Sequence, residues 1–484
     1  MSIAGLLFLI LVHYLSGSGI VRMFRIEEPP GKQITLSLIL GVVASSFVPF
    51  ILQLLYIPIT FTSVLTGLCI SVVALNIFPL GKRKFSLPDR KRYRPGIRLY
   101  EWPFILVIAS IVLVSMWRCF YYPPTPRDML SGPETIAEYA IREHTMINSV
   151  YSLNLETTNN HLKSTYTTSL QIIYKLFVYD FGGLWVVLLS TSFIIFLYQT
   201  LKEKLHPVLT GLIMLLFVST PEVFGYSYMM MYDYSNMIFF FLGVYYLKKY
   251  LDTQAPRFFY FGSLILGFAT HIRSETLVLV GMMLPLLWYY FYKRKYPLKR
   301  TALYSVCLVG MPYLAYFLGM TIYVKRYLPV PYDVSNDINH NLADISPFFQ
   351  RLSDMTSTLI IGETSYMYYG YFFVIFLLVL ASDLVRFRGM KESAWYWLYM
   401  VGLIFIGLPL LGYLLPLVDL TNTTKRGLFK IFPLMILYMQ QNRVLLALSD
   451  IMSKWEHGAP QQAAPAKAPV ATGQAAKKGG GKKK

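Results

Sequence analysis

Apolar runs long enough to cross a lipid bilayer recur throughout this 484-residue chain. A helix needs about 20 apolar residues to span the hydrocarbon core of a bilayer, and several runs approach that length. The composition agrees, because 55% of the residues are hydrophobic and only 14% are charged, whereas a soluble domain carries about 25% charged residues. These features predict an all-α polytopic membrane protein.

The placement of lysine and arginine predicts the path of the chain. Basic residues collect in short segments between apolar runs, of which GKRKFSLPDRKRYRPGIR at 81–98 is the richest. The positive-inside rule places such segments in the cytoplasm, and most of them then fall on one side of a path of about 13 spans. The predicted spans are 3–20, 36–55, 61–78, 102–117, 184–198, 208–218, 237–246, 258–270, 277–292, 302–323, 371–384, 395–415 and 428–439. The same bias accounts for the formal net charge of +19, so we expect membrane lipids, and no nucleic acid, as partners.

The runs divide the chain into three regions. Residues 1–100 are predicted to hold additional N-terminal membrane helices and a basic cytoplasmic loop. Residues 101–446 form the predicted membrane core, with long outer loops at 120–175 and 324–367. Residues 447–484 are rich in Ala, Pro, Gly, Gln and Lys, which predicts a disordered basic cytoplasmic tail.

The loop at 120–175 concentrates acidic, amide and hydroxyl side chains. Ser131, Pro133 and Glu134 fit a helix start in which Glu134 completes a capping box, and the apolar residues that follow predict an amphipathic helix on the membrane surface. Asp128 lies in an irregular segment with no such structural role. It is either a solvated carboxylate, a partner of Arg127, or a functional group.

Polar residues otherwise concentrate in the outer segments, while the middles of the predicted spans carry almost no charge. A transporter places ionisable residues inside its spans, where they are costly and functional. The pattern therefore favours an enzyme that works at the outer leaflet on a lipid-borne substrate.

Several segments resemble the GT-C superfamily of membrane glycosyltransferases, in the branch of the aminoarabinose transferase and the protein mannosyltransferases. Within 127–444, the chain reads PETIAEYAIREHTM at 133–146 and LKSTYTTSLQIIYKLF at 162–177, where Glu134 and Lys163 fall on a glutamate and a lysine of the family. Pro133 stands where the family has an aspartate, and Asp128 is the nearest replacement. Three later segments are also similar: YDYSNMIFFFLGVYYLKKYL with Asp233, GFATHIRSETLVLVGMMLPLL with Arg273 and Glu275, and TKRGLFKIFPLMIL with Arg426.

The resemblance implies a GT-C-like core and transfer of a sugar from a polyprenyl-phosphate or pyrophosphate donor, with inversion, to a glycan, lipid or protein acceptor. A carboxylate would act as the base, with Asp128 as first choice and Glu134 as the alternative. Both are also candidate ligands of a divalent cation. Asp233 and Glu222 are expected at an acceptor or acidic site. The phosphate-binding candidates are Arg426, Lys163, Arg273, Lys325 and Arg326.

Two other functions stay open at this point: a transporter or flippase of lipids or lipid-linked glycans, and a membrane assembly factor without catalysis. The family branch and the style of the tail favour a bacterial inner membrane. In that setting the active site would face the periplasm and the C-terminus the cytoplasm.

Overall fold

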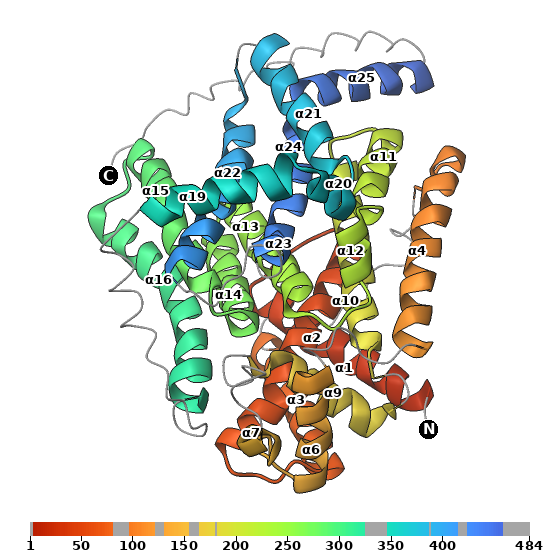
Figure 1. Cartoon of the computed structure of the whole chain (residues 1–484), viewed down its shortest axis with the longest axis vertical. Coiled ribbons are helices and arrows are strands. Elements are labelled where there is room, and N and C mark those ends of the chain that lie inside the picture. The colour runs from red at the N-terminus through yellow and green to blue at the C-terminus, as the bar shows by residue number, and fades with distance from the viewer. Residues whose placement is uncertain are drawn as a thin grey trace, which may run out of the picture.

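The structure is a computed structural model, and it describes residues 3–80, 96–121, 130–153, 164–179, 182–324, 346–386, 389–414 and 424–457. Every regular element in those ranges is a helix (Figure 1). The candidate sites Asp128, Lys163, Lys325 and Arg326 lie outside the described residues. The all-helical prediction is confirmed for the described part of the chain.

Seven described helices are long and apolar enough to cross a membrane. They are α1 (Ile3–Met23), α2 (Pro30–Leu54), Leu99–Phe120 in η1 (Leu99–Glu101) and α4 (Trp102–Tyr121), α10 (Leu184–Lys202), α15 (Thr276–Lys293), Leu298–Val324 in α16 (Leu298–Tyr316) and η5 (Phe317–Val324), and Glu392–Gly412 in α22 (Glu392–Leu414). Two bent pairs raise the count to nine: α20 (Glu363–Tyr369) with α21 (Phe372–Arg386), and α24 (Ile431–Gln441) with α25 (Arg443–His457). The chain is thus a multi-pass membrane protein by length and composition.

The predicted path of about 13 spans needs four further crossings. The helices available for them are α3 (Phe61–Leu80), α11 (Pro207–Val218), α13 (Tyr232–Thr253) and α14 (Pro256–Ile272). Of α3, only Phe61–Ile77 counts as an apolar helix, and it is shorter than the seven candidate spans, as are α11 and α14; α13 is long enough but more polar. The larger count therefore stays a prediction.

Helices α13 and α14 form an antiparallel pair at the centre of the described structure (Figure 1). Gln254 ends α13 in the left-handed conformation, with φ 57°, and Pro256 begins α14. A residue in the left-handed conformation commonly ends a helix, and proline is common at the first position of the next one. The chain runs along α13 and comes back along α14, so the end of α14 lies beside the start of α13. This brings Arg273 next to Asp233.

Segments rich in lysine and arginine meet at one end of the helices, called here the basic end. Lys32 pairs with Glu203 at 2.8 Å, and Lys249 pairs with Glu28 at 2.6 Å. Further contacts at this end are Arg257 to the Arg25 carbonyl, Lys202 to Glu101, Lys293 to Glu392 and Arg98 to Glu456. The described basic segments thus gather on one side, as the alternation of runs predicts.

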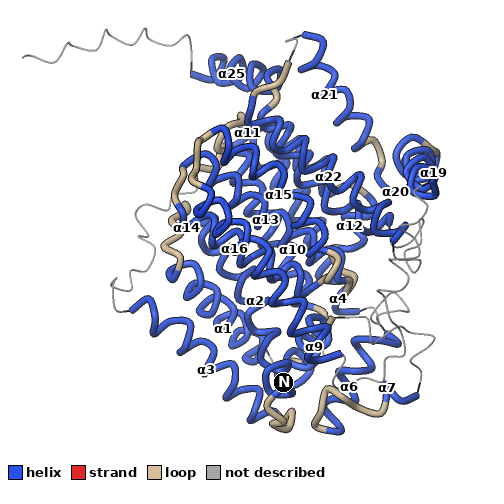
Figure 2. The backbone as a smooth tube through the Cα atoms, turned by 90° about the vertical axis from the view of Figure 1, so that its left-hand side faces the viewer, coloured by secondary structure: helices blue, strands red, loops and turns tan. Residues whose placement is uncertain are grey.

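The remaining described elements lie toward the other end. They are η2 (Leu130–Glu134), α6 (Thr135–Glu143), α7 (Val150–Leu153), α9 (Thr165–Phe177), α12 (Pro221–Tyr226), α19 (Ser346–Met355), η6 (Thr356–Ile361), α23 (Lys425–Gly427) and η8 (Leu428–Lys430). Figure 2 shows α12, α19 and α20 on one side of the molecule with α6 and α7 below them, and α14 on the opposite side. The end opposite the basic one therefore carries the short helices of the outer loops.

Two predictions about α6 and the tail are wrong. The apolar side of α6 packs against α9, with Ile136 and Ala140 buried, so it does not lie free on a membrane surface. Residues 443–457 form α25, so the disorder predicted from residue 447 onward is wrong for 447–457, while 458–484 lie outside the described residues. The predicted separation of residues 1–100 from the core stays a prediction, although α2 packs extensively on α9 and α10.

Helices α1 and α2 approach each other closely through glycine, and this gives a testable expectation. A Cβ at Gly41 would lie 1.7 Å from the carbonyl oxygen of His13. Gly41→Ala is therefore expected to destabilise the protein by about 1–3 kcal/mol, the usual cost of overpacking. A shift of the unfolding midpoint in detergent would measure it.

Gly310→Ala in α16 is the matched control, because nothing lies within 4 Å of a Cβ there. Alanine favours a helix over glycine by about 1 kcal/mol, so this variant should be neutral or slightly more stable. Equal effects of the two substitutions would contradict the close approach of α1 and α2.

Candidate functional site

Asp233 and Arg273 form the first part of a charged site at the end opposite the basic one. The Arg273 guanidinium donates to Asp233 Oδ1 from Nη2 at 2.5 Å and from Nε at 3.2 Å. Asp233 is only 1% exposed. One turn further along α13, the Asn236 amide donates to the Ala269 carbonyl at 2.7 Å and to Thr276 Oγ1 at 2.9 Å. These bonds fix the ends of α13, α14 and α15 together and hold the ion pair in place.

Glu275 and Lys430 extend the site from the α14–α15 turn to the segment before α24. Lys430 Nζ donates to Glu275 Oε1 at 3.0 Å, and Lys430 is fully buried. Arg273 Nε lies 3.9 Å from the same carboxylate oxygen. Burial alone would raise the pKa of the Glu275 carboxyl, but the surrounding cations, Arg273 first, outweigh it and lower that pKa to about 2. Glu275 is therefore ionised at neutral pH and bridges two cations.

Glu222 and Lys425 form the third pair. Lys425 Nζ lies 2.7 Å from Glu222 Oε1 and 3.9 Å from the centre of the Tyr368 ring. The Tyr369 hydroxyl donates to the Lys425 carbonyl at 3.0 Å. Contact of an ammonium with an aromatic face adds electrostatic attraction. The short helices α12, α20 and α23 are thereby joined at one point.

Arg426 belongs to the same site and links its parts electrostatically. It helps to lower the pKa of Glu275. Burial raises the pKa of the Tyr226 hydroxyl, Glu222 raises it further, and Arg426 opposes that rise. The charged cluster, as we call it, consists of Glu222, Asp233, Arg273, Glu275, Lys425, Arg426 and Lys430. Its four cations face three carboxylates, so it carries an excess positive charge when all are ionised.

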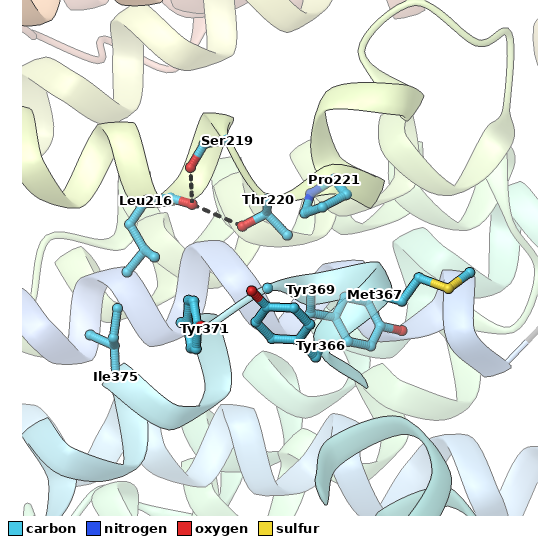
Figure 3. A pocket seen from close by; sticks show the side chains of 10 residues that line it. Leu216, Ser219, Thr220, Pro221, Tyr366, Met367, Tyr369, Tyr371 and Ile375 are labelled. Atoms are coloured by element: carbon cyan, nitrogen blue, oxygen red, sulfur yellow. Dashed lines mark hydrogen bonds between the residues drawn. The ribbon is translucent and has the colours of Figure 1, made fainter. Parts of the chain in front are cut away.

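An open pocket of about 420 Å³ adjoins the cluster at α12 and α20 (Figure 3). It lies between the end of α11, the start of α12, and the bend where α20 meets α21 at 98°. Gly370 at that bend has φ 57°, a conformation that other residues rarely adopt. The lining residues are Leu216, Ser219, Thr220, Pro221, Tyr366, Met367, Tyr369, Gly370, Tyr371 and Ile375. The pocket is thus lined by apolar and aromatic side chains. Two of its lining residues, Pro221 and Tyr369, are next in sequence to Glu222 and Tyr368 of the Lys425 contacts.

Glu134 occupies a separate set of contacts. Lys175 Nζ lies 2.6 Å from Glu134 Oε1, and the Gln171 amide donates to Glu134 Oε2 at 2.5 Å. The Trp185 indole donates to Gln171 Oε1 at 2.8 Å. Both carboxylate oxygens are therefore engaged by α9, and these contacts extend to α10 rather than to the charged cluster. The structure differs from the helix start predicted at Ser131, because Glu134 itself stands at the N-cap of α6, where its side chain makes no capping hydrogen bond.

The structure thus brings four of the predicted site residues together, namely Glu222, Asp233, Arg273 and Arg426. Lys425 and Lys430 were not singled out from the sequence, although they flank Arg426 in the same TKRGLFK segment. Within the described ranges, no three His, Cys, Asp or Glu residues are close enough to hold a metal ion. The predicted cation site at Asp128 and Glu134 is not tested by that finding, since Asp128 is outside those ranges.

Comparison with known proteins adds no relative. No family model matches the sequence, and no curated protein or solved structure matches it.

Proposed function

We propose that the chain is a membrane glycosyltransferase of GT-C type. It transfers a sugar from a polyprenyl-phosphate or pyrophosphate donor to an acceptor at the non-cytoplasmic face. The observation that carries the proposal is the charged cluster beside an apolar pocket, at the end away from the basic segments. A phosphate on a lipid chain needs cations and an apolar surface within reach of each other.

The cations of the cluster suit the leaving lipid phosphate. Charge-assisted hydrogen bonds from Arg and Lys are the strong ones, and Arg binds phosphate oxygens bidentately. Arg426 is the first choice for this contact, with Arg273 and Lys425 beside it. Lys163, Lys325 and Arg326 remain candidates for the same role. The pocket lined by Tyr366 and Met367 would receive the first part of the lipid chain.

A carboxylate has to take the proton of the attacking acceptor. The hydroxyl or amine forms a bond to the anomeric carbon while the bond to the lipid phosphate breaks, so a single displacement inverts the configuration. Asp128 is preferred as the base, because Glu134 is already paired with Lys175 and bonded to Gln171. Asp233 and Glu222, which lie within the charged cluster, orient the acceptor. A divalent cation held with Asp128 could share the charge of the phosphate.

Transfer by purified protein from a panel of polyprenyl-phosphate sugars tests this function. Asp128→Asn is expected to lower the rate by about 10²–10⁴-fold, the usual contribution of a general base. Glu134→Gln should lower it less, through loss of the Lys175 contact. Glu392→Gln, in an exposed ion pair with Lys293 at the basic end, is the control and should retain full activity.

Three outcomes are informative. If Asp128→Asn and Glu134→Gln both keep full transfer, the catalytic assignment is wrong. If the wild type transfers no sugar but moves a lipid-linked glycan across liposomes, the chain is a transporter. If it does neither, the assembly role is favoured. His13 is a titratable group inside the candidate span α1, but Ser45 and Tyr174 bond both of its ring nitrogens, so it braces helices and does not argue for transport.

The cellular setting follows from the same proposal. The positive-inside rule would place the basic end in the cytoplasm, with α25 and the C-terminus there and the charged cluster across the membrane. A bacterial inner membrane is the proposed location.

A further inference from the structure

Helix α25 lies across the basic end instead of continuing the direction of α24. The two helices are bent by 59° at Asn442. At its start, the Arg443 amide donates to Asp383 Oδ1 in α21 at 3.1 Å. In its middle, Ser449 Oγ accepts from the His206 amide at 2.7 Å. Figure 1 shows α25 lying crosswise at the top of the molecule beside α21.

The far end of α25 is fixed to the segment just before α4. Glu456 forms an ion pair with Arg98 and accepts a hydrogen bond from the Tyr100 hydroxyl at 3.1 Å. The candidate span Leu99–Phe120 starts at the very next residue after Arg98. The end of α25 therefore sits at the depth where a membrane span enters the bilayer. That depth is the boundary between headgroups and acyl chains.

One side of α25 is apolar and exposed. Leu448 is 41% exposed, Ile451 44% and Trp455 82%. Their spacings of three and four residues place them on one side of the helix. Ser449 and Glu456 face the protein on a second side, and exposed Asp450 and Lys454 lie on a third. A helix with this division has an apolar strip that nothing in the described structure covers.

The surroundings of the strip define its partner. Leu99 is 86% exposed and Trp102 is 47% exposed at the start of the neighbouring span, so that start also carries exposed apolar side chains. Tryptophan is enriched at the membrane interface, where its ring is apolar and its N–H is polar. The cations at this end include Lys454, which is exposed on α25 itself, Lys204, whose ammonium donates to Gln441, and Arg98 and Lys202, which are paired with Glu456 and Glu101. Positive charge next to an apolar strip fits an anionic lipid surface.

We propose that α25 is an interfacial lipid-binding helix. The strip Leu448–Ile451–Trp455 inserts at the acyl boundary of an anionic leaflet, while Lys454 and the neighbouring cations contact the headgroups. The interaction ties the basic end, through α24, to the segment that holds Lys430 and Arg426. It does not depend on the proposed catalytic function.

Tryptophan quenching in proteoliposomes tests the proposal. The full chain is reconstituted in phosphatidylcholine mixed with phosphatidylglycerol, using acyl chains brominated either near the glycerol or near the methyl end. The emission lost on changing Trp455 to Phe defines the contribution of Trp455. We expect bromine near the glycerol to quench most of that contribution, bromine near the methyl end to quench less, and aqueous iodide to quench little.

Leu448→Ser combined with Ile451→Ser is the second variant, and both positions are exposed, so the fold should survive. It is expected to make the Trp455 contribution accessible to iodide and to reduce its quenching by brominated lipid. Quenching of Trp455 by iodide alone in the wild type would overturn the proposal. Protection from both quenchers, together with a dimer that Trp455→Phe dissociates, would also overturn it, because a second copy of the chain would then cover the strip.

Discussion

Replacing Glu275 with glutamine is expected to destabilise the folded protein by about 3–5 kcal/mol, the usual cost of leaving one partner of a buried ion pair uncompensated. Lys430, its partner at 3.0 Å, is fully buried. Its ammonium would lose the carboxylate that offsets its removal from water. The Arg273 guanidinium would also lose one of its two neighbouring negative charges, although its ion pair with Asp233 remains. The free energy of unfolding in mixed micelles with denaturant measures the change.

A double-mutant cycle separates this cause from a general loss of packing. Glu275→Gln combined with Lys430→Met removes both charges, and replacing a buried pair by apolar groups is often close to neutral. The double variant should therefore be more stable than Glu275→Gln alone. Glu392→Gln is the matched control, because its pair with Lys293 has a similar distance of 2.8 Å but is more than half exposed. Exposed pairs contribute about 0–1 kcal/mol, so Glu392→Gln should lower the free energy of unfolding by less than Glu275→Gln. Equal losses of stability in the two variants would contradict the burial argument.

The same pair predicts how stability changes in acid. The folded-state pKa of Glu275 is about 2, below its ordinary value of 4.5. A carboxyl with a lowered pKa contributes stability above its unfolded pKa and loses it as the pH falls through the folded one. The difference in unfolding free energy between wild type and Glu275→Gln should thus be constant above about pH 4.5 and shrink toward pH 2. A constant difference over that range would contradict the assignment.

The sequence predicted which residues share an end of the helices better than it predicted their pairings. Alternating spans place Asp233, Arg273 and Arg426 at the same end, because each stands at the outer limit of an apolar run. The structure brings them into one cluster with Glu222. Asp233 meets Arg273 because the turn between α13 and α14 folds the two helices side by side. Pro256, which begins α14 just after Gln254, marks that turn in the sequence.

The remaining pairings depend on tertiary contacts that a sequence pattern does not carry. Glu134 fits a capping box by spacing, but Lys175 and Gln171 on α9 take both of its oxygens. A local capping pattern predicts the partners of a carboxylate poorly when a cation from another helix can form a charge-assisted hydrogen bond with it. Lys430 was missed for a similar reason. Nothing in the run GLFK shows that its ammonium turns inward to Glu275.

Replacing Arg426 with alanine is expected to raise the KM for the lipid-phosphate donor by about ten- to a hundredfold, the equivalent of a charge-assisted hydrogen bond worth about 1.5–3 kcal/mol. With an acceptor that carries no phosphate, the KM for the acceptor should stay near its wild-type value. Arg426→Lys keeps the charge and loses the bidentate geometry, so its donor KM should fall between those of the wild type and the alanine variant. Initial rates with donor and acceptor varied in turn measure both constants.

The donor-specific effect is what distinguishes phosphate binding from a structural role of Arg426. Arg426 also acts on Glu275, so a merely structural loss would lower the amount of folded enzyme and change the apparent kcat without a selective rise in the donor KM. Arg257→Ala, at the basic end, is the control for removing an arginine, since its guanidinium bonds only to the Arg25 carbonyl among the described hydrogen bonds. If Arg426→Ala changes donor and acceptor dependence equally, the phosphate role is wrong. In that case the charged cluster would serve to hold the ends of α13, α15 and α24 together. A donor KM of Arg426→Lys closer to the wild type would then not reflect phosphate binding.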